Sequence, residues 1–164
     1  MIEILNKLLT LNTENELVEF KKAKTQIDKD KLGQYFSALS NEANLKDLTN
    51  AWLILGIKND KSIVGTSISD TQLNEYKLEL ATHTNPKLSF DSTESINKDG
   101  RIIILCKIAA APQGLPVSWK GRCYGRDGES LGPLNDNERD KIKIQNAALD
   151  WSAQIIHSAT LDEE

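Results

Sequence analysis

The sequence contains acidic residues whose types and spacing could support chemistry on a phosphodiester. Glu14 and Glu19 lie five residues apart at a predicted strand, and Asp60 follows a second predicted strand. If the two strands lie side by side, these carboxylates converge beside Lys21, where they would hold Mg²⁺ or Mn²⁺ against a phosphodiester. They are therefore the predicted catalytic and metal-binding residues of a nuclease. Because surface carboxylates are common, the spacing alone favours a solvated strand face instead.

Basic residues form a second set, suited to binding a polyanion. Residues 20–31 contain five lysines against two aspartates, and residues 119–126 combine three cationic side chains with two aromatic ones. Proteins bind nucleic acid with little sequence preference by placing lysine and arginine at phosphates and by stacking bases on aromatic rings. An ordinary hairpin with half-buried aromatic residues is the alternative for the second segment. The predicted nucleic-acid contacts are Lys21, Lys22, Lys58, Lys120, Arg122 and Arg126 at phosphates, with Trp119 and Tyr124 for stacking.

Motifs for other kinds of site do not fit. Residues 56–62 follow a predicted strand and end in Lys-Ser, but the lysine comes one position too early for a phosphate loop, and Asp60 before it would repel phosphate. Residues 121–128 likewise miss the spacing of a dinucleotide-binding loop. The cysteines have no paired spacing, so we expect two buried free thiols at Cys106 and Cys123. The sequence therefore implies no cofactor, other than Mg²⁺ or Mn²⁺ for a nuclease.

The composition fits one globular domain. The chain has 164 residues, of which 39% are hydrophobic and 27% charged, so it can bury about two-thirds of its unfolded surface. Its net charge of −4 excludes binding driven by overall charge, but it leaves room for a local basic surface. No apolar run approaches the roughly 20 residues of a membrane span, and residues 1–7 lack the features of a signal peptide. We therefore expect a cytoplasmic protein without membrane contact.

Hydrophobic patterns predict the strands that position the charged residues. Period-two alternation over 17–21 places Glu19 and Lys21 on one face and Val18 and Phe20 on the other. Further strands are expected at 52–57, which is apolar on both faces as in a central strand, and at 63–65, 87–92, 101–108 and 117–125. Residues 126–130 are predicted to be a polar exit from the last of these strands.

Helical spacing and capping residues predict the helices. They are expected at 1–10, at 30–44, from Ser69 to about 81 or 83, and from Asn135 through Trp151 and Ile155. Gln72 and Glu138 complete capping-box patterns with Ser69 and Asn135. The helix at 30–44 has Leu32, Tyr35, Phe36 and Leu39 on one face. Together the elements predict an α+β fold, with a mixed, mainly antiparallel sheet flanked by helices in a single compact domain.

Four segments in order along the chain match the motifs of a known family. The segments are Glu14 with Glu19-Phe20-Lys21, the helix at 37–44, the strand at 52–57 with its return at 63–65, and residues 124–138. In this order they resemble the Schlafen/AlbA-like domain, a bacterial DNA-binding or divergent ATPase-like domain. The match covers residues 13–140. Residues 1–12 are then an N-terminal helix, and residues 141–164 are a C-terminal helix with a link to a further domain.

The resemblance also implies functions. In the eukaryotic branch of the family, two glutamates and an aspartate form a metal-dependent RNA-cleaving site, which implies these roles for Glu14, Glu19 and Asp60. Asp60 matches only with a two-residue shift, because Lys58 stands at the family's acidic position. We therefore favour a DNA-binding domain of a bacterial transcriptional-regulator-like protein over a metal-dependent endoribonuclease. A nucleotide-sensing or protein-interaction module is a further alternative. The expected partners are DNA or RNA, with homo-oligomer formation left open.

Overall fold

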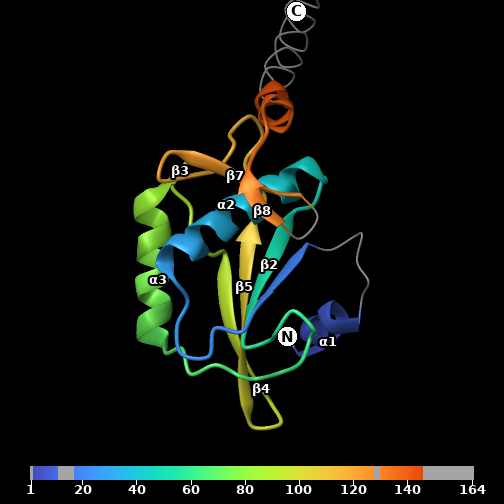
Figure 1. Ribbon diagram of the computed structural model, residues 1–164, viewed down its shortest axis with the longest axis vertical. Helices are drawn as coiled ribbons and strands as arrows, with labels where there is room; N and C mark the ends of the chain where they lie inside the picture. The colour runs from blue at the N-terminus through green and yellow to red at the C-terminus, as the bar shows by residue number, and fades with distance from the viewer. Residues whose placement is uncertain (1, 11–16, 128–129, 146–164) are drawn as a thin grey trace, which may run out of the picture.

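The computed structural model describes residues 2–10, 17–127 and 130–145, and Figure 1 shows their arrangement. The helices are α1 (Ile2–Thr10), α2 (Lys29–Leu45), α3 (Asp70–His83) and a last helix over 136–145. The strands are β1 (Val18–Lys21), β2 (Asn50–Leu55), β3 (Thr84–Asn85), β4 (Ser92–Lys98), β5 (Arg101–Ala109), β6 (Ser118–Trp119), β7 (Arg122–Asp127) and β8 (Ser130–Pro133). None of the described helices is long and apolar enough to cross a membrane.

Two sheets organise these strands. The larger sheet has the order β1-β2-β5-β4, in which β1 runs parallel to β2 and the other neighbours are antiparallel. Its register places Glu19 beside Leu53 and Lys21 beside Leu55. The smaller sheet, β3-β6-β7-β8, is antiparallel and lies against α2, near the carboxyl end of β5 in Figure 1. The predicted α+β fold with a mixed, mainly antiparallel sheet and flanking helices is therefore confirmed.

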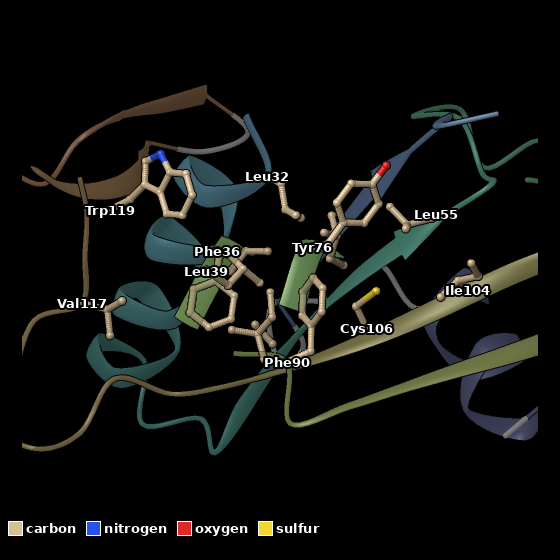
Figure 2. Packing of buried hydrophobic residues seen from close by; sticks show 14 of the residues in the cluster. Leu32, Phe36, Leu39, Leu55, Tyr76, Phe90, Ile104, Cys106, Val117 and Trp119 are labelled. Carbon is tan, nitrogen blue, oxygen red and sulfur yellow. The ribbon is translucent and has the colours of Figure 1, made fainter. Parts of the chain in front are cut away.

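Hydrophobic side chains cover both faces of the larger sheet. α2 and α3 pack on one face, and Figure 2 shows the rings and aliphatic side chains that meet there. α1 covers the opposite face, where Leu5 and Leu8 form a cluster with Trp52, Ile54 and their neighbours. The prediction that residues 52–57 are apolar on both faces is thus confirmed, because β2 is buried between the two clusters.

Polar side chains on α2 attach the smaller sheet to this helix. The amide of Asn41, which is fully buried, donates to the carbonyl oxygens of Val117 and Tyr124 (both 3.0 Å) and accepts from the Val117 N–H (2.8 Å). The buried Ser37 hydroxyl donates to the Val117 carbonyl (2.7 Å) and accepts from the Tyr124 N–H (3.0 Å). A buried polar group left without a partner costs about 1–3 kcal/mol. These bonds therefore hold residues 117–124 at one position along the helix.

Local capping fixes the starts of two helices as predicted. The Ser69 hydroxyl accepts from the Gln72 N–H (3.2 Å), and the Gln72 side chain accepts from the Ser69 N–H (2.9 Å). Asn135 and Glu138 make the same reciprocal pair at the start of the last helix (2.8 and 3.4 Å). Each pair satisfies two N–H groups that a helix start would otherwise leave open.

The return strand predicted over 63–65 is wrong. Among the described residues, this segment forms one isolated antiparallel bridge, between Ile63 and Ile57, and no strand. The segment instead folds over Gly56, whose carbonyl accepts from two of its N–H groups (2.9 Å each). Gly56 has a φ of 98°, a conformation that glycine adopts without strain, and two N–H groups directed at one carbonyl do not form a ladder.

Two predicted strands have different bounds in the structure, whereas the strand predicted over 101–108 is confirmed as β5. The strand expected over 87–92 is wrong except at its last residue, because β4 begins at Ser92 and pairs with β5 through the turn Asp99-Gly100 (φ 54° and 81°). The strand expected over 117–125 divides into β6 and β7 around Lys120-Gly121 (φ 48° and 83°). Positive φ at both central residues gives the type I′ turn, whose twist matches antiparallel strands. The polar exit predicted over 126–130 instead contains the end of β7 and the start of β8.

The two cysteines are free thiols, as predicted, but only Cys106 is buried. Cys106 is fully buried on β5, and burial raises its pKa to about 12. Cys123 on β7 is half-buried, and burial raises its pKa as well. Both thiols therefore stay protonated near neutral pH, which makes them poor nucleophiles and poor metal ligands.

Some predictions concern residues outside the described ranges. The continuation of the last helix through Trp151 and Ile155 lies beyond residue 145, and Glu14 lies between α1 and β1 in the sequence. The domain boundaries at residues 12 and 140 stay predictions.

Replacing Gly33 by alanine tests the contact between α2 and the smaller sheet. A Cβ at Gly33 would lie 2.0 Å from the indole of Trp119. Alanine favours a helix over glycine by about 1 kcal/mol, so helix propensity opposes the clash. We expect Gly33→Ala to lower the free energy of unfolding by about 1–3 kcal/mol in urea denaturation. Gly132→Ala, with open space around it, is the control, and equal stability of the two variants would contradict this packing.

Candidate functional site

An open hollow lies where the carboxyl ends of β1 and β2 meet. The strands are parallel, so they end at the same edge, and the Lys21 carbonyl accepts from the N–H groups of Gly56 and Ile57 (2.8 and 3.3 Å). The hollow has a volume of about 520 Å³. Its lining residues are Phe20, Lys21, Lys22, Lys58, Asn59 and Asp60. The structure therefore brings together three of the predicted phosphate-binding lysines and one of the predicted carboxylates.

Lys21 is held at the hollow by two neighbours. Its ammonium donates to the Tyr35 hydroxyl (2.7 Å) and pairs with Glu19 (3.2 Å). Burial alone would lower the pKa of Lys21, but the hydrogen bond to Tyr35 and the charge of Glu19 outweigh burial and raise the pKa. The side chain is 25% exposed, so Lys21 lines the hollow with a charged ammonium that Tyr35 and Glu19 hold in place.

Lys22 and Lys58 are exposed, and neither has a hydrogen bond or ion pair from its side chain within the described ranges. Lys22 follows β1, and Lys58 begins the polar turn after β2. In that turn the Asp60 carboxylate accepts from the hydroxyl and the N–H of Ser62, and these two bonds lower the pKa of Asp60. Asp60 is thus an exposed, charged residue that stabilises its own turn.

Arg126 lies at the junction of the two sheets, with its side chain largely enclosed. Its guanidinium pairs with Glu19 (3.1 Å), and each side chain is only 9% exposed. It also donates to the Val18 carbonyl (3.5 Å), while the Arg126 N–H donates to Glu42 (3.3 Å). These contacts join β7 to β1 and α2. The phosphate contact predicted for Arg126 would require this ion pair to open.

The described carboxylates do not form the predicted acidic site. Glu14 lies outside the described ranges, and Asp60 lies in an exposed turn. One oxygen of Glu19 pairs with Lys21 and the other with Arg126, so the protein's own cations occupy both. Residues 2–10, 17–127 and 130–145 contain no group of three or more His, Cys, Asp or Glu that could hold a metal ion. The surroundings of Glu19 therefore do not fit Mg²⁺ or Mn²⁺, and the catalytic roles stay predictions.

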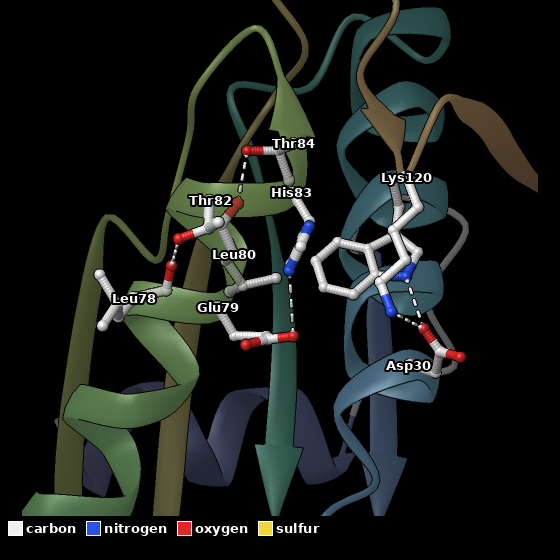
Figure 3. A network of polar contacts seen from close by, with 9 residues as sticks. Asp30, Leu78, Glu79, Leu80, Thr82, His83, Thr84 and Lys120 are labelled. Carbon is white, nitrogen blue, oxygen red and sulfur yellow. Dashed lines mark hydrogen bonds and ion pairs between the residues drawn. The ribbon is translucent and has the colours of Figure 1, made fainter.

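None of the second basic segment lines the hollow. Lys120 pairs with Asp30 at 2.8 Å, as Figure 3 shows, and the indole N–H of Trp119 donates to the same carboxylate (3.2 Å). Trp119 is only 1% exposed, so its ring has no free face on which a base could stack. Tyr124 is half-buried against the core. Arg122 is exposed and has no side-chain partner among the described residues.

Sequence reasoning missed two residues that shape this region. Tyr35 was expected to lie in the apolar face of its helix, but it is half-buried and its hydroxyl holds Lys21. A tyrosine on an apolar helix face is itself a signal, because its hydroxyl needs a polar partner when the ring is buried. Glu42 is 6% exposed and meets the backbone of Arg126, and no local spacing indicates that contact.

The chain is similar to known proteins in sequence and in fold. A family model described as Schlafen, AlbA_2 matches residues 14–135. The structure of the DIP2311 protein from Corynebacterium diphtheriae is similar, with a TM-score of 0.60 and 18% identity over 88% of this chain. This chain spans 28% of that protein's length, and the likeness shows the fold alone. The N-terminal domain of a RecG-related protein from Nitrosomonas europaea has a TM-score of 0.49 and 18% identity, covering 81% of this chain and 92% of that one. No curated protein matches the chain.

Replacing Arg126 by methionine tests whether the ion pair with Glu19 supports the fold. The change leaves a buried carboxylate without its arginine, so we expect the free energy of unfolding to fall by about 3 kcal/mol. Adding Glu19→Gln should restore part of this loss, because a neutral amide needs no counter-charge. Arg122→Met, on an exposed residue of the same strand, is the control. Urea denaturation that finds the two arginine variants equally stable would contradict a structural role for the pair.

The stability of the domain should also depend on the protonation of Glu42. Burial raises the pKa of Glu42, the Arg126 N–H partly opposes the rise, and the negative charge of Glu138 adds to it. The folded state then keeps a proton that the unfolded chain loses above its ordinary pKa of about 4.3, so stability falls as pH rises through the raised value. We expect Glu42→Gln to flatten this fall in urea denaturation from about pH 4.5 to about pH 8. Glu75→Gln, on the exposed side of α3, should leave it unchanged, and an equal slope in both variants would contradict the role of Glu42.

Proposed function

The chain belongs to the Schlafen, AlbA_2 family, and on this basis we propose that it binds nucleic acid through phosphate contacts at the hollow beside β1 and β2. Membership of this family supports nucleic-acid binding in general. The observation that carries the proposal is the local charge of the hollow. Three lysines, Lys21, Lys22 and Lys58, line it against one carboxylate, Asp60, in a chain whose net charge is −4.

The three lysines differ in how they would meet a phosphate. Lys21 is held by Tyr35 and Glu19, so its ammonium needs little reorganisation on binding. Lys22 and Lys58 are exposed on flexible four-carbon stems and can adapt to successive phosphates of a strand. Contacts of this kind fix the position of a nucleic acid but carry no sequence information. The expected binding is therefore salt-dependent, with little sequence preference.

In its finer form, the proposal is a DNA-binding domain of a bacterial transcriptional-regulator-like protein that acts in the cytoplasm. Lysine contacts alone do not separate DNA from RNA, because both carry the same phosphodiester. Single- and double-stranded DNA and RNA should therefore be compared in one assay. A gel of the same samples in Mn²⁺ would detect cleavage, the outcome that would support a nuclease instead.

Reversing the charge of the exposed lysines tests the proposal. Lys22→Glu and Lys58→Glu should each weaken binding to a labelled oligonucleotide by about tenfold at low salt. Each change should also reduce the slope of log affinity against log salt by about one. Lys87→Glu, on an exposed lysine beyond the end of α3 and outside the hollow, is the charge-matched control. Fluorescence polarisation across a salt series measures both quantities.

Two results would contradict a binding site at the hollow. One is binding that Lys87→Glu weakens as much as Lys58→Glu does, which would show a response to net charge alone. The other is binding that does not change with salt, because phosphate contacts release counterions and must depend on it.

A further inference from the structure

The outer edge of β4 has no partner strand within the described part of the chain. β4 is the last strand in the order β1-β2-β5-β4 and pairs with β5 alone. Lys98 and Arg101 close the two-residue hairpin turn, where the closing pair is hydrogen-bonded, and such pairs alternate along a ladder with pairs that are not. The backbone groups of Thr93, Ser95 and Asn97 therefore point away from β5, towards the open edge.

We propose that this edge pairs with the same edge of a second copy of the chain, antiparallel, with Ile96 opposite Ile96 of the second copy. In this register Glu94 lies opposite Lys98 of the second copy, and Lys98 lies opposite its Glu94. Both charged pairs are thus attractive. Ser95 lies opposite Asn97 of the second copy, so the outward backbone groups of both strands meet. The two charged pairs then occupy non-hydrogen-bonded positions, where opposite side chains lie closest.

Charge complementarity selects this register over its neighbours. The outward backbone groups are at odd-numbered residues, so only registers that place odd opposite odd form a ladder. The neighbouring register, centred on Ser95, places Glu94 opposite Ile96 and Lys98 opposite Ser92, with no charged pair. Edge strands often carry charges that keep other strands away. Here the two charges have opposite signs and are four residues apart, so a reversed copy of the strand matches them.

The rest of the domain leaves the outward backbone groups of this edge accessible, and Lys98 keeps one contact within its own chain, a hydrogen bond from its ammonium to the Asn6 side chain (3.1 Å). Ser95 and Asn97, which carry outward backbone groups, are exposed. α3 approaches the chain just before β4, where the Ser89 hydroxyl donates to the Lys77 carbonyl (3.1 Å). In an antiparallel pair this end of β4 faces the hairpin turn of the second copy, not its α3. The hairpin of β4 and β5 extends past the rest of the domain in Figure 1, which also leaves room for a second copy.

The proposed pairing joins two four-stranded sheets into one continuous sheet of eight strands. β1 and β4 are at opposite edges of the sheet, so the two hollows would lie at its far ends and stay open. The inference depends on β4 alone. It stands whether or not the hollow binds nucleic acid, and Glu94 and Lys98 do not line the hollow.

Exchange of the two charges tests the pairing. Sedimentation equilibrium of the full chain over a concentration series should show a monomer–dimer equilibrium. Glu94→Lys and Lys98→Glu should each weaken the dimer by about tenfold or more, because each variant turns both attractive pairs into repulsive ones. An equimolar mixture of the two variants should regain the wild-type association. In that mixed dimer every lysine at these positions again lies opposite a glutamate.

The mixture separates the proposal from a folding defect, since two misfolded variants would not rescue each other. Circular dichroism of each variant alone checks that it is folded. A wild-type chain that stays monomeric at every concentration would overturn the proposal. A dimer that neither charge reversal weakens would also overturn it, as would folded variants whose mixture stays monomeric.

Discussion

The buried amide of Asn41 is the interaction on which the arrangement of the whole domain depends. It uses both its donor and its acceptor on the backbone of Val117 and Tyr124, so the smaller sheet has one position on α2. Tyr124 is followed two residues later by Arg126, which is thereby placed against Glu19 of the larger sheet. A hydrogen bond between a side chain and the backbone thus determines where a buried ion pair forms. Because Arg126 is used in this pair, it is not among the cations that stay on the surface.

Sequence patterns predicted the elements whose causes are local. The reciprocal bonds of Ser69 and Gln72 lie within one helical turn, and the apolar run of β2 follows from burial on both faces. The strand expected over 87–92 failed because its alternating apolar residues enter the core from an irregular segment. The turn at Lys120-Gly121 was missed because it places a lysine at positive φ, which composition does not indicate. These errors arise where tertiary packing outweighs local preference.

The candidate site was predictable only as far as it depends on neighbouring strands. Lys21 and Lys58 come together because the parallel strands β1 and β2 end at one edge, the arrangement that was expected to bring the carboxylates together beside Lys21. The use of Arg126 inside the protein was not predictable, because it meets Val18, 108 residues away, only after the smaller sheet has docked. The sequence shows which residues are cationic, but it does not show which of them form structural ion pairs and which stay on the surface. Tertiary packing determines that.

The contacts of Asn41 also order events during synthesis of the chain. Its partners Val117 and Tyr124 lie 76 and 83 residues later in the sequence. On the ribosome, α2 emerges long before this segment exists, and until then the Asn41 amide has only water and the Ser37 hydroxyl of its own helix (3.5 Å) as partners. Pairings between residues so distant form slowly, because loop closure must come first. Residues 117–124 therefore cannot pack on α2 while the first half of the chain is being translated. The polar side chains of α2 that bind this segment stay hydrated until residue 124 has left the ribosomal exit tunnel.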